Sequence, residues 1–582
     1  MTAWNEEHRS HLTGYPSIDK PWMQYYTSRQ GNLSSANTSM YTFFYERNKE
    51  FESRTALKYF GQTITYKELF ANIDHTAGML TDLGVKKGDI VSTCMLSMPE
   101  AVYLIYAINK IGAISNQLAL TSPVEDLINQ IQSTESKVVF TVDIAIDKIV
   151  RATKSCNVEH IVSVPLATSM PFYMKTIMSL RKKATYKNVK CWDKLYKKKH
   201  TNQVMIEPAD GNAIAVIEYT GGSTGIPKGV MISNFSANAY VINFIDSSEI
   251  TYERSQVFLN IIPPFLVYGT FPCLHVPLCT GVTTVLSPDS DPKKLPKLIK
   301  QYKPNHFCCG PLHINEMLHS KELSKMDLSF ILSIWYGGEK LPFSWEEKVT
   351  LFMKSHGARY SIMNGYGMTE TTGAVVSGTH ISNMVLPFVY SNIMVVNPET
   401  NEELPYDCEG EFWISTPTMM NGYYKDEKGT NQVISDLNGE KWLHTGDLGI
   451  VRSNGTIEIT GRLKRIYWRK TVENTIVRVY PVRIENIIES NKNVSRCAVV
   501  GLKNGEKGYD TVAFITLNKE NDNRIENSIK SELFELCKAS LPDSHVPSEI
   551  IILTKMPLTR GGKIDYLLLE HDYNQKYMMN NL

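Results

Sequence analysis

The sequence has almost no net charge and no clustered set of cysteines, and these absences exclude several classes of protein. Its 582 residues include 61 basic and 60 acidic side chains, which leave a formal charge of +1. That balance provides no overall field for a nucleic-acid backbone, so we expect no nucleic-acid partner. Of the 10 cysteines only Cys308 and Cys309 lie close together, which is the spacing of neither a metal site nor a disulfide framework.

Long apolar runs are also missing. No segment reaches the roughly 18 apolar residues that would span a bilayer. The first residues, MTAWNEEHRSHL, lack the charged-then-apolar order of a secretory signal. The 42% apolar and 21% charged residues are ordinary values for a folded protein. We therefore expect a soluble protein of the reducing cytoplasm.

The first part of the chain alternates between helical and strand patterns. Thr65 and Glu68 have the spacing of a capping box, and apolar residues then recur at helical spacing up to Gly84. Apolar strand candidates lie at residues 90–96, 213–218, 283–286, 306–309 and 331–336. This alternation predicts a layered α/β architecture in which helices cover a mostly parallel sheet.

The pattern changes near residue 389, where short β-like runs separated by turns predict an antiparallel β subdomain. Beyond residue 463 the chain has the pattern of a small α+β unit. We therefore expect a large N-terminal domain over residues 1–463, with the β-rich subdomain at about 389–463. A small C-terminal domain would follow over residues 464–582.

A glycine-rich segment at residues 219–230, YTGGSTGIPKGV, directly follows the strand candidate 213–218. Its glycines allow backbone N–H groups to approach an anion, its hydroxyl side chains add donors, and its lysine adds a positive charge. It is not the GxxxxGK[ST] loop of kinases and GTPases, because no glycine directly precedes the lysine. The residues expected to bind phosphate are Thr220, Gly221, Gly222, Ser223, Thr224, Gly225 and Lys228.

This segment resembles the signature loop of the adenylate-forming superfamily, which includes acyl-CoA synthetases, luciferases and peptide-synthetase adenylation domains. Other motifs similar to those of the family follow in the family's order, so the resemblance covers roughly residues 40–570. It implies a large N-terminal domain, a small mobile C-terminal domain that carries a catalytic lysine, and ATP as a substrate.

The segment NGYGMTET at residues 364–371 resembles the family's adenine and metal motif. Tyr366 offers an aromatic face to the base, Thr369 can donate to a phosphate, and Glu370 would hold Mg²⁺, which prefers carboxylate oxygens. The resemblance assigns ATP contacts to Asn364, Gly365, Tyr366, Gly367 and Thr369. It also implies that Gly337, Gly338 and Glu339 line the adenine and acyl pockets.

Further residues toward the C-terminus take their expected roles from the same resemblance. Asp447 in HTGDLG would accept hydrogen bonds from the ribose, and Arg462 in GRLKR would also reach the ribose. Lys464 would be the hinge between the two domains. Lys563 in PLTRGGKID would neutralise the charge that builds on the α-phosphate and the attacking carboxylate.

Together these motifs imply an AMP-forming acid–thiol ligase. It would use ATP and Mg²⁺ to convert a carboxylic acid to an acyl adenylate and would then transfer the acyl group to CoA. Such chemistry needs positioning and charge stabilisation, so Lys563, Lys228 and Glu370 are the expected catalytic residues.

The segment IIPPFLVYGTFP at residues 261–272 resembles the family's motif at the acyl pocket. Members that activate amino acids carry an aspartate where this chain has Leu266, and a leucine cannot compensate a buried ammonium. Leu266, together with Phe265, Tyr268 and Gly337, therefore favours a hydrophobic acyl or aryl acid. A fatty acid, and hence a role in fatty acid metabolism, is our first expectation.

Two alternatives stay open. The hairpin after the hinge contains KTVENTIVRVYP and lacks the glycine that the family has near the incoming thiol. The acceptor could therefore be the phosphopantetheine of a carrier protein instead of CoA. The other alternative is a nucleotide-binding homologue that has lost catalysis, although the intact set of motif residues argues against it.

A basic and apolar insertion lies at residues 171–199. Its second part carries ten lysines and arginines against a single acid, Asp193, and its first part could form one apolar helix face. This composition is typical either of a solvated surface insertion or of a segment that makes weak peripheral contact with a membrane.

Overall fold

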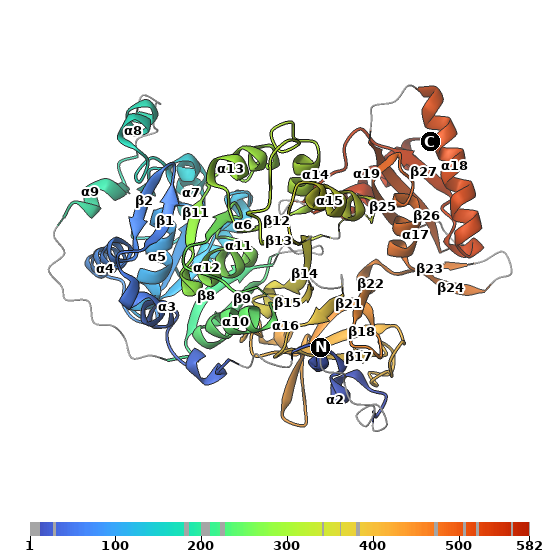
Figure 1. Cartoon of the computed structure of the whole chain (residues 1–582), viewed down its shortest axis with the longest axis horizontal. Coiled ribbons are helices and arrows are strands. Elements are labelled where there is room, and N and C mark those ends of the chain that lie inside the picture. Colours follow the sequence, from blue (N-terminus) through green and yellow to red (C-terminus); the bar gives the residue numbers. More distant parts are fainter. Residues whose placement is uncertain are drawn as a thin grey trace.

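The computed structural model shows two large sheets with helices around them, a smaller antiparallel sheet and a C-terminal unit at one end (Figure 1). It describes residues 12–26, 31–179, 186–198, 210–220, 227–248, 250–339, 341, 343–360, 362–379, 384–470, 475–503, 508–518, 523–559 and 563–580. No described helix is long and apolar enough to cross a membrane.

The first large sheet contains the strand that leads into the glycine-rich segment. In spatial order its strands are β19 (Gly422–Tyr423), β9 (Gly229–Ser233), β8 (Ile214–Tyr219), β4 (Ile114–Gln117), β3 (Ile90–Cys94), β5 (Val138–Val142), β6 (His160–Val164) and β7 (Val189–Cys191). The strands from β8 to β7 pair in parallel, whereas β9 and β19 add antiparallel pairs at one edge. Every residue of β5 is buried, as expected for a strand covered on both faces.

The second large sheet carries the predicted adenine and acyl motifs. In spatial order its strands are β16 (Val385–Pro387), β15 (Gly373–Gly378), β14 (Ile362–Met368), β13 (Ser333–Gly337), β12 (His306–Cys309), β10 (Val257–Asn260), β11 (Thr283–Leu286), β1 (Thr55–Tyr59) and β2 (Gln62–Thr65). The strands from β14 to β1 are parallel, and the outer strands are antiparallel.

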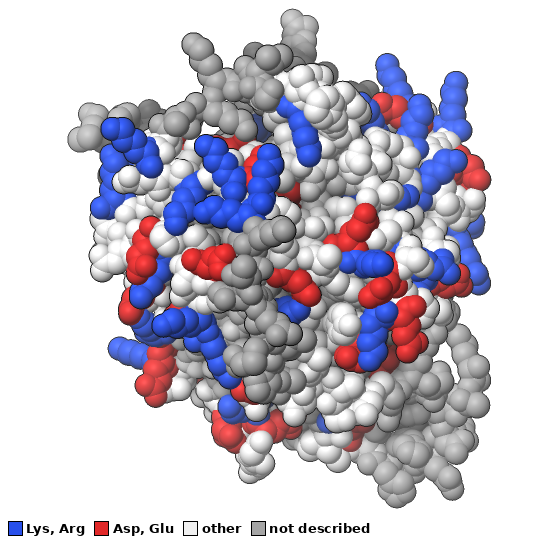
Figure 2. Space-filling model, turned by 90° about the vertical axis from the view of Figure 1, so that its left-hand side faces the viewer, with Lys and Arg blue, Asp and Glu red and all other residues white. Residues whose placement is uncertain are grey.

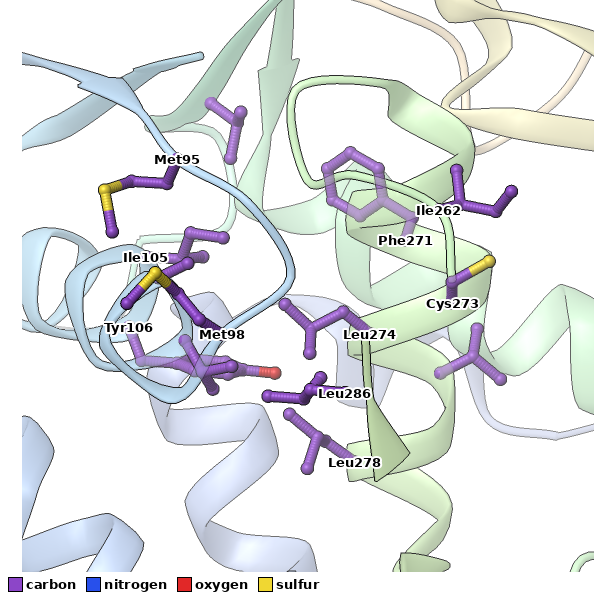
Figure 3. Close-up of a cluster of buried hydrophobic side chains, with 14 of the residues drawn as sticks. Met95, Met98, Ile105, Tyr106, Ile262, Phe271, Cys273, Leu274, Leu278 and Leu286 are labelled. Atoms are coloured by element: carbon purple, nitrogen blue, oxygen red, sulfur yellow. The ribbon is translucent and has the colours of Figure 1, made fainter. Parts of the chain in front are cut away.

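One hydrophobic core joins both large sheets. Helix α5 (Pro99–Lys110) is buried along its whole length. Figure 3 shows Ile105 and Tyr106 of this helix, with Met98 before it, facing Leu274 and Leu278 from the segment that follows the acyl motif. The acyl motif is therefore anchored in the centre of the N-terminal core.

The remaining helices cover these sheets or belong to the C-terminal unit. The longer ones are α3 (Met40–Asn48), α4 (Tyr66–Asp82), α6 (Val124–Ser133), α7 (Ile146–Thr153), α8 (Phe172–Ser179), α10 (Asn234–Ser247), α13 (Leu295–Tyr302), α14 (Pro311–Leu318), α15 (Phe343–Ser355), α17 (Pro481–Glu489), α18 (Asn523–Ser540) and α19 (Tyr566–Asn580). The shorter ones are α2 (Pro16–Asp19), α9 (Trp192–Tyr196), α11 (Val267–Thr270), α12 (Val276–Thr280) and α16 (Glu427–Asn431).

The predicted α/β fold class is confirmed, and so are several local features. The Thr65 hydroxyl accepts a hydrogen bond from the Glu68 N–H at 3.2 Å, and the Glu68 carboxylate accepts one from the Thr65 N–H at 2.8 Å, which completes the capping box of α4. The strand candidates are present as β3, β8, β11, β12 and β13; β11 and β12 have the predicted ends, and the ends of the other three are shifted by at most two residues. The apolar pattern and the turn residues were therefore sufficient to locate these elements.

The smaller antiparallel sheet and the C-terminal unit complete the chain. The sheet contains β17 (Asn392–Val396), β18 (Gly410–Ser415), β21 (Glu440–Val451), β20 (Ile434–Leu437) and β22 (Ile457–Arg462). The C-terminal strands are β23 (Tyr467–Lys470), β24 (Ile476–Val479), β25 (Val494–Lys503), β26 (Tyr509–Leu517) and β27 (Glu549–Ile552). Their buried side chains form two clusters that share no residue with the other cores, so we propose a domain boundary near Leu463.

Candidate active site

The predicted adenine and acyl motifs meet at the carboxyl ends of parallel strands, which is where ligands bind in open α/β sheets. Gly337 at the end of β13 pairs with Gly365 of β14. A Cβ atom at Gly367 would come within 1.9 Å of the Gly373 carbonyl oxygen, so only glycine fits this close approach of two strands. Asn364 also lies on β14, and Thr369 and Glu370 follow in a 3₁₀ turn (Thr369–Thr371).

Asp447 is the centre of a hydrogen-bonded triad. The Tyr366 hydroxyl donates to one carboxylate oxygen at 2.8 Å, and Arg462 Nε donates to the other at 2.6 Å. Asp447 and Arg462 are direct partners on β21 and β22, so the sheet register itself brings them together. Burial disfavours the charged guanidinium of Arg462 and lowers its pKa, but the Asp447 carboxylate has the larger opposite effect. The pKa of Arg462 is therefore raised above its ordinary value.

Glu370 belongs to a second cluster, which also contains Lys228. The Tyr423 hydroxyl donates to Glu370 Oε1 at 2.8 Å, and the Lys228 ammonium lies 4.4 Å from the centre of the Tyr423 ring. Lys228 also pairs with Asp426 at 3.1 Å. The Gly429 N–H and the Lys228 side chain lower the pKa of Asp426. Two predicted catalytic residues are thus held in one place by Tyr423.

Nothing in the sequence marked Tyr423 and Asp426 as site residues. Strand β19, which carries Tyr423, pairs with β9, which directly follows Lys228. That pairing joins segments almost two hundred residues apart in the printed sequence, so no local pattern could have revealed it.

The glycine-rich segment is described only at its two ends. Gly221, Gly222, Ser223, Thr224 and Gly225, all predicted to bind phosphate, lie outside the described residues. At the ends, the Thr220 N–H donates to the Lys228 carbonyl at 3.1 Å, and the Thr220 hydroxyl accepts from the Lys228 N–H at 3.3 Å. These two hydrogen bonds therefore hold the backbone of Lys228 beside Thr220, where β8 ends and β9 begins.

Lys563 of the C-terminal unit faces the groups described above. The residue is exposed, yet the surroundings of its ammonium group are crowded. Burial lowers the pKa of Lys563, the Arg462 charge lowers it further, and the carboxylates of Glu339, Asp447 and Glu370 act in the opposite direction. One lysine from the end of the chain thus lies near both the Asp447 triad and Glu370.

Glu339 connects the two units of the chain. Its Oε1 accepts a hydrogen bond from the Ile564 N–H at 2.5 Å, and its Oε2 forms an ion pair with Arg496 on β25. The resemblance assigned Glu339 to ATP binding, whereas the structure uses both of its carboxylate oxygens to hold the C-terminal unit. Gly338 beside it has a φ of +89°, a left-handed conformation that favours glycine.

The predicted acyl motif packs directly against the end of β13. The Tyr268 hydroxyl donates to the Trp335 carbonyl at 3.0 Å, and a Cβ atom at Gly337 would lie 4.0 Å from the Tyr268 ring. Phe265 is buried and Leu266 is half-buried at the start of α11. A π-helical turn (Phe271–His275) follows, a distortion that is frequent at functional sites.

The predicted hinge lies where the chain passes between the two units. Lys464 is exposed in a 3₁₀ turn (Leu463–Arg465) between β22 and β23. Arg465 beside it forms an ion pair with Glu485 of α17 at 2.5 Å. The hairpin that follows is described at its strands only, because residues 471–474 lie outside the described ranges.

Comparison with known families agrees with this arrangement. The family model of the AMP-binding enzyme matches residues 44–424, and that of the AMP-binding enzyme C-terminal domain matches residues 483–563. The chain belongs to this family of adenylate-forming enzymes. The resemblance inferred from the motifs is therefore confirmed.

Similar proteins span nearly the same length. The long-chain-fatty-acid–CoA ligase of Bacillus subtilis (strain 168) is 26% identical over 560 residues, which are 94% of this chain and 96% of that protein. The probable 4-coumarate–CoA ligase 1 of Dictyostelium discoideum is 27% identical over 520 residues, or 86% and 90% of the two chains. The fold is shared with ATP-bound MatB from Rhodopseudomonas palustris, with a TM-score of 0.78, 21% identity and coverage of 93% and 99%.

This AMP-binding family member also has a buried carboxyl group directly before the glycine-rich segment. Glu218 of β8 is fully buried, and its Oε1 accepts a hydrogen bond from the Thr270 hydroxyl of the acyl motif at 2.6 Å. Its Oε2 has no hydrogen-bond partner among the described residues. Burial raises the pKa of Glu218 to about 8, although the Thr270 hydroxyl opposes this. The group is therefore protonated at neutral pH.

We expect Glu218→Gln to remove a pH dependence of stability. The native state holds a proton on Glu218 from its ordinary pKa of 4.5 up to about 8, while the unfolded state does not, so stability falls as pH rises through this window. Between about pH 6 and pH 8 the loss is roughly 2 to 3 kcal/mol. Urea unfolding of the wild type and the variant at several pH values measures it, with the exposed Glu347→Gln as control. A stability difference that stays constant with pH would contradict the assignment.

Proposed function

We propose that this enzyme activates an apolar carboxylic acid with ATP and transfers the acyl group to CoA. The observation that carries the proposal is that Ile564 of the C-terminal unit contacts Glu339 at 2.5 Å, while the neighbouring Lys563 interacts with the charges of Arg462, Asp447 and Glu370. A site that combines two cations and two carboxylates around one space is suited to a nucleotide and its metal.

In the first half-reaction a carboxylate oxygen of the acid attacks the α-phosphorus of ATP, and pyrophosphate leaves with the electrons of the broken P–O bond. Several negative groups must approach one another, so the ammonium of Lys563 would stabilise the charge at the reacting centre. Lys228 would bind the outer phosphates, and the Asp447 triad would orient the ribose.

A metal ion fits the chemistry of the donors near Lys228. Glu370 has one carboxylate oxygen bound by Tyr423, which leaves the other for a cation, and Mg²⁺ commonly takes one or two carboxylates together with phosphate oxygens. Bound there, Mg²⁺ would neutralise phosphate charge. The described residues contain no group of three or more acidic, histidine or cysteine ligands, so phosphate and water would supply the other ligands.

In the second half-reaction a thiol attacks the adenylate carbonyl, a C–S bond forms as the C–O bond to the phosphate of AMP breaks, and AMP and the thiol proton leave. The contact between Glu339 and the Ile564 N–H would hold Lys563 at the proposed site during the first half-reaction. We propose that the C-terminal unit turns about Lys464 to admit the thiol.

The acid is proposed to be apolar because no charged group lies among the predicted pocket residues Phe265, Leu266, Tyr268 and Gly337. The names of the relatives cover both aliphatic and aromatic acids. A fatty acid remains our first proposal.

A carrier protein is the second candidate acceptor. Trp468 on β23 and Ile476 on β24 are 48% and 66% exposed, and this hairpin follows the hinge directly. An apolar surface at this place would suit a protein that carries phosphopantetheine.

A panel of acids tests the proposal. Carboxylates from acetate to long-chain and aromatic acids, together with amino acids, are mixed with ATP and Mg²⁺, with CoA or with a pantetheinylated carrier. We expect pyrophosphate release with apolar acids and an acyl-CoA product. If none of the acids supports pyrophosphate release, the assigned activity is contradicted. A preference for amino acids would contradict the proposed acid class. Formation of product only with the carrier would show that the acceptor is the carrier and not CoA.

A further inference from the structure

Helix α8 presents apolar side chains to solvent. Phe172, Tyr173 and Ile177 are 84%, 64% and 64% exposed. At 100° per residue these three side chains and Thr176 fall within one stripe of the helix. Met174 and Met178 lie on the other side and pack against the N-terminal core. The two methionines therefore anchor the helix, and the side that carries Phe172, Tyr173 and Ile177 is left exposed.

The segment after this helix gathers positive charge. Lys187, Lys194, Lys197 and Lys198 are exposed. Within the described part of the chain no carboxylate lies within ion-pair distance of these four lysines. The only acid of the segment, Asp193, accepts a hydrogen bond from the Thr168 hydroxyl at 3.1 Å. The lysines therefore keep their charge available to a partner.

The apolar helix and the lysines lie at the same end of the molecule. The hydrogen bond from Thr168 to Asp193 fixes the segment before α8 against α9. In Figure 1 both helices lie at the left-hand end of the molecule, far from the C-terminal unit. Figure 2, which shows that end, has lysine and arginine side chains in its upper left part and also along its right-hand edge.

We propose that this surface, formed by α8 and the lysines of residues 187–198, docks on a bilayer that contains anionic lipids. Phe172, Tyr173 and Ile177 would enter the boundary between headgroups and acyl chains, and the lysines would contact lipid phosphates. A projecting helix offers no groove for a peptide. A nucleic acid would leave the apolar side chains exposed to water. An anionic bilayer would bury the apolar side chains and also pair with the lysines.

Vesicle binding by the full chain tests the proposal. Phosphatidylcholine vesicles with and without phosphatidylglycerol are sedimented with the protein at low and high salt. We expect binding to be stronger with the anionic lipid and to weaken with salt, because exposed charges are screened. Equal binding to both kinds of vesicle, or binding to neither, would overturn the proposal, and capture of a soluble protein without vesicle binding would point to that partner class instead.

Two variants separate the contributions. The triple variant Lys194→Gln, Lys197→Gln, Lys198→Gln should weaken binding to anionic vesicles by about tenfold to a hundredfold. The triple variant Phe172→Ser, Tyr173→Ser, Ile177→Ser should lose binding at low salt as well. Wild-type binding by either variant would overturn the proposal.

Matched changes elsewhere provide the controls. Lys321→Gln, Lys325→Gln, Lys348→Gln removes three exposed lysines outside the surface, and Leu351→Ser replaces a leucine that is 60% exposed on α15. Both controls should bind vesicles like the wild type. All variants should release pyrophosphate normally with a soluble acid, since the surface lies outside the proposed site, and a control that weakens binding equally would overturn the assignment of the surface.

Discussion

Lys563→Ala is expected to lower acid-dependent pyrophosphate release by about 10²- to 10³-fold. The ammonium of Lys563, which belongs to the C-terminal unit, interacts with the charges of Arg462, Asp447 and Glu370. Removing it leaves the charge of the pentavalent phosphorus without its partner. ATP binding should change much less, because Lys228, Asp447 and Arg462 belong to the N-terminal unit.

The variant should still transfer a supplied acyl adenylate to thiol, because that step uses the site after Lys563 has acted. Measuring pyrophosphate exchange and thioester formation separately distinguishes the two half-reactions. Lys555→Ala, an exposed lysine of the same unit, is the control and should behave like the wild type. Intact exchange in Lys563→Ala would show that the lysine has no part in adenylation.

The pH profile offers a second readout of Lys563. Its crowded surroundings, which desolvate the ammonium, and the Arg462 charge place the pKa of Lys563 below the ordinary 10.5, so the ammonium loses its proton at a lower pH than an isolated lysine would. Adenylation should therefore decline on the alkaline side of the profile. That decline should be missing from the residual activity of the alanine variant.

The sequence was sufficient for those parts of the site that depend on local pattern. The strand that ends at Tyr219, the glycines of residues 364–367 and the register partners Asp447 and Arg462 all lie in short segments with recognisable order. The strand follows from its apolar pattern, whereas the glycines, Asp447 and Arg462 were predicted from short segments that resemble the family's motifs.

Contacts between distant segments could not be read in the same way. Glu370 and Tyr423 are 53 residues apart, and Glu339 and Ile564 are 225 residues apart. Which carboxylate oxygen meets which donor depends on the packing of whole sheets and on the placement of the C-terminal unit. The double use of Glu339 is therefore a finding of the structure alone.

Glu339→Gln is expected to lower adenylation by about a hundredfold or more. The side chains of Arg496 and Glu339 are only 8% and 15% exposed, and Nε and Nη1 of Arg496 have no other partner among the described residues. Breaking a buried ion pair by removing one charge costs about 3 to 5 kcal/mol, because the other charge stays buried and unpaired. The loss of the pair should therefore destabilise the arrangement in which the C-terminal unit holds Lys563 at the site.

Arg496→Met should give the same defect as Glu339→Gln if the pair acts by holding the C-terminal unit. The double variant should then be less impaired than the sum of the single changes, since no unpaired charge remains. The KM for ATP should stay close to that of the wild type in all three, and transfer from a supplied adenylate should be retained. Arg483→Met, which breaks a pair with Glu409 whose arginine is 50% exposed, is the control and should have a small effect. A raised KM for ATP in Glu339→Gln but not in Arg496→Met would instead assign Glu339 to the nucleotide, as the sequence motif predicts.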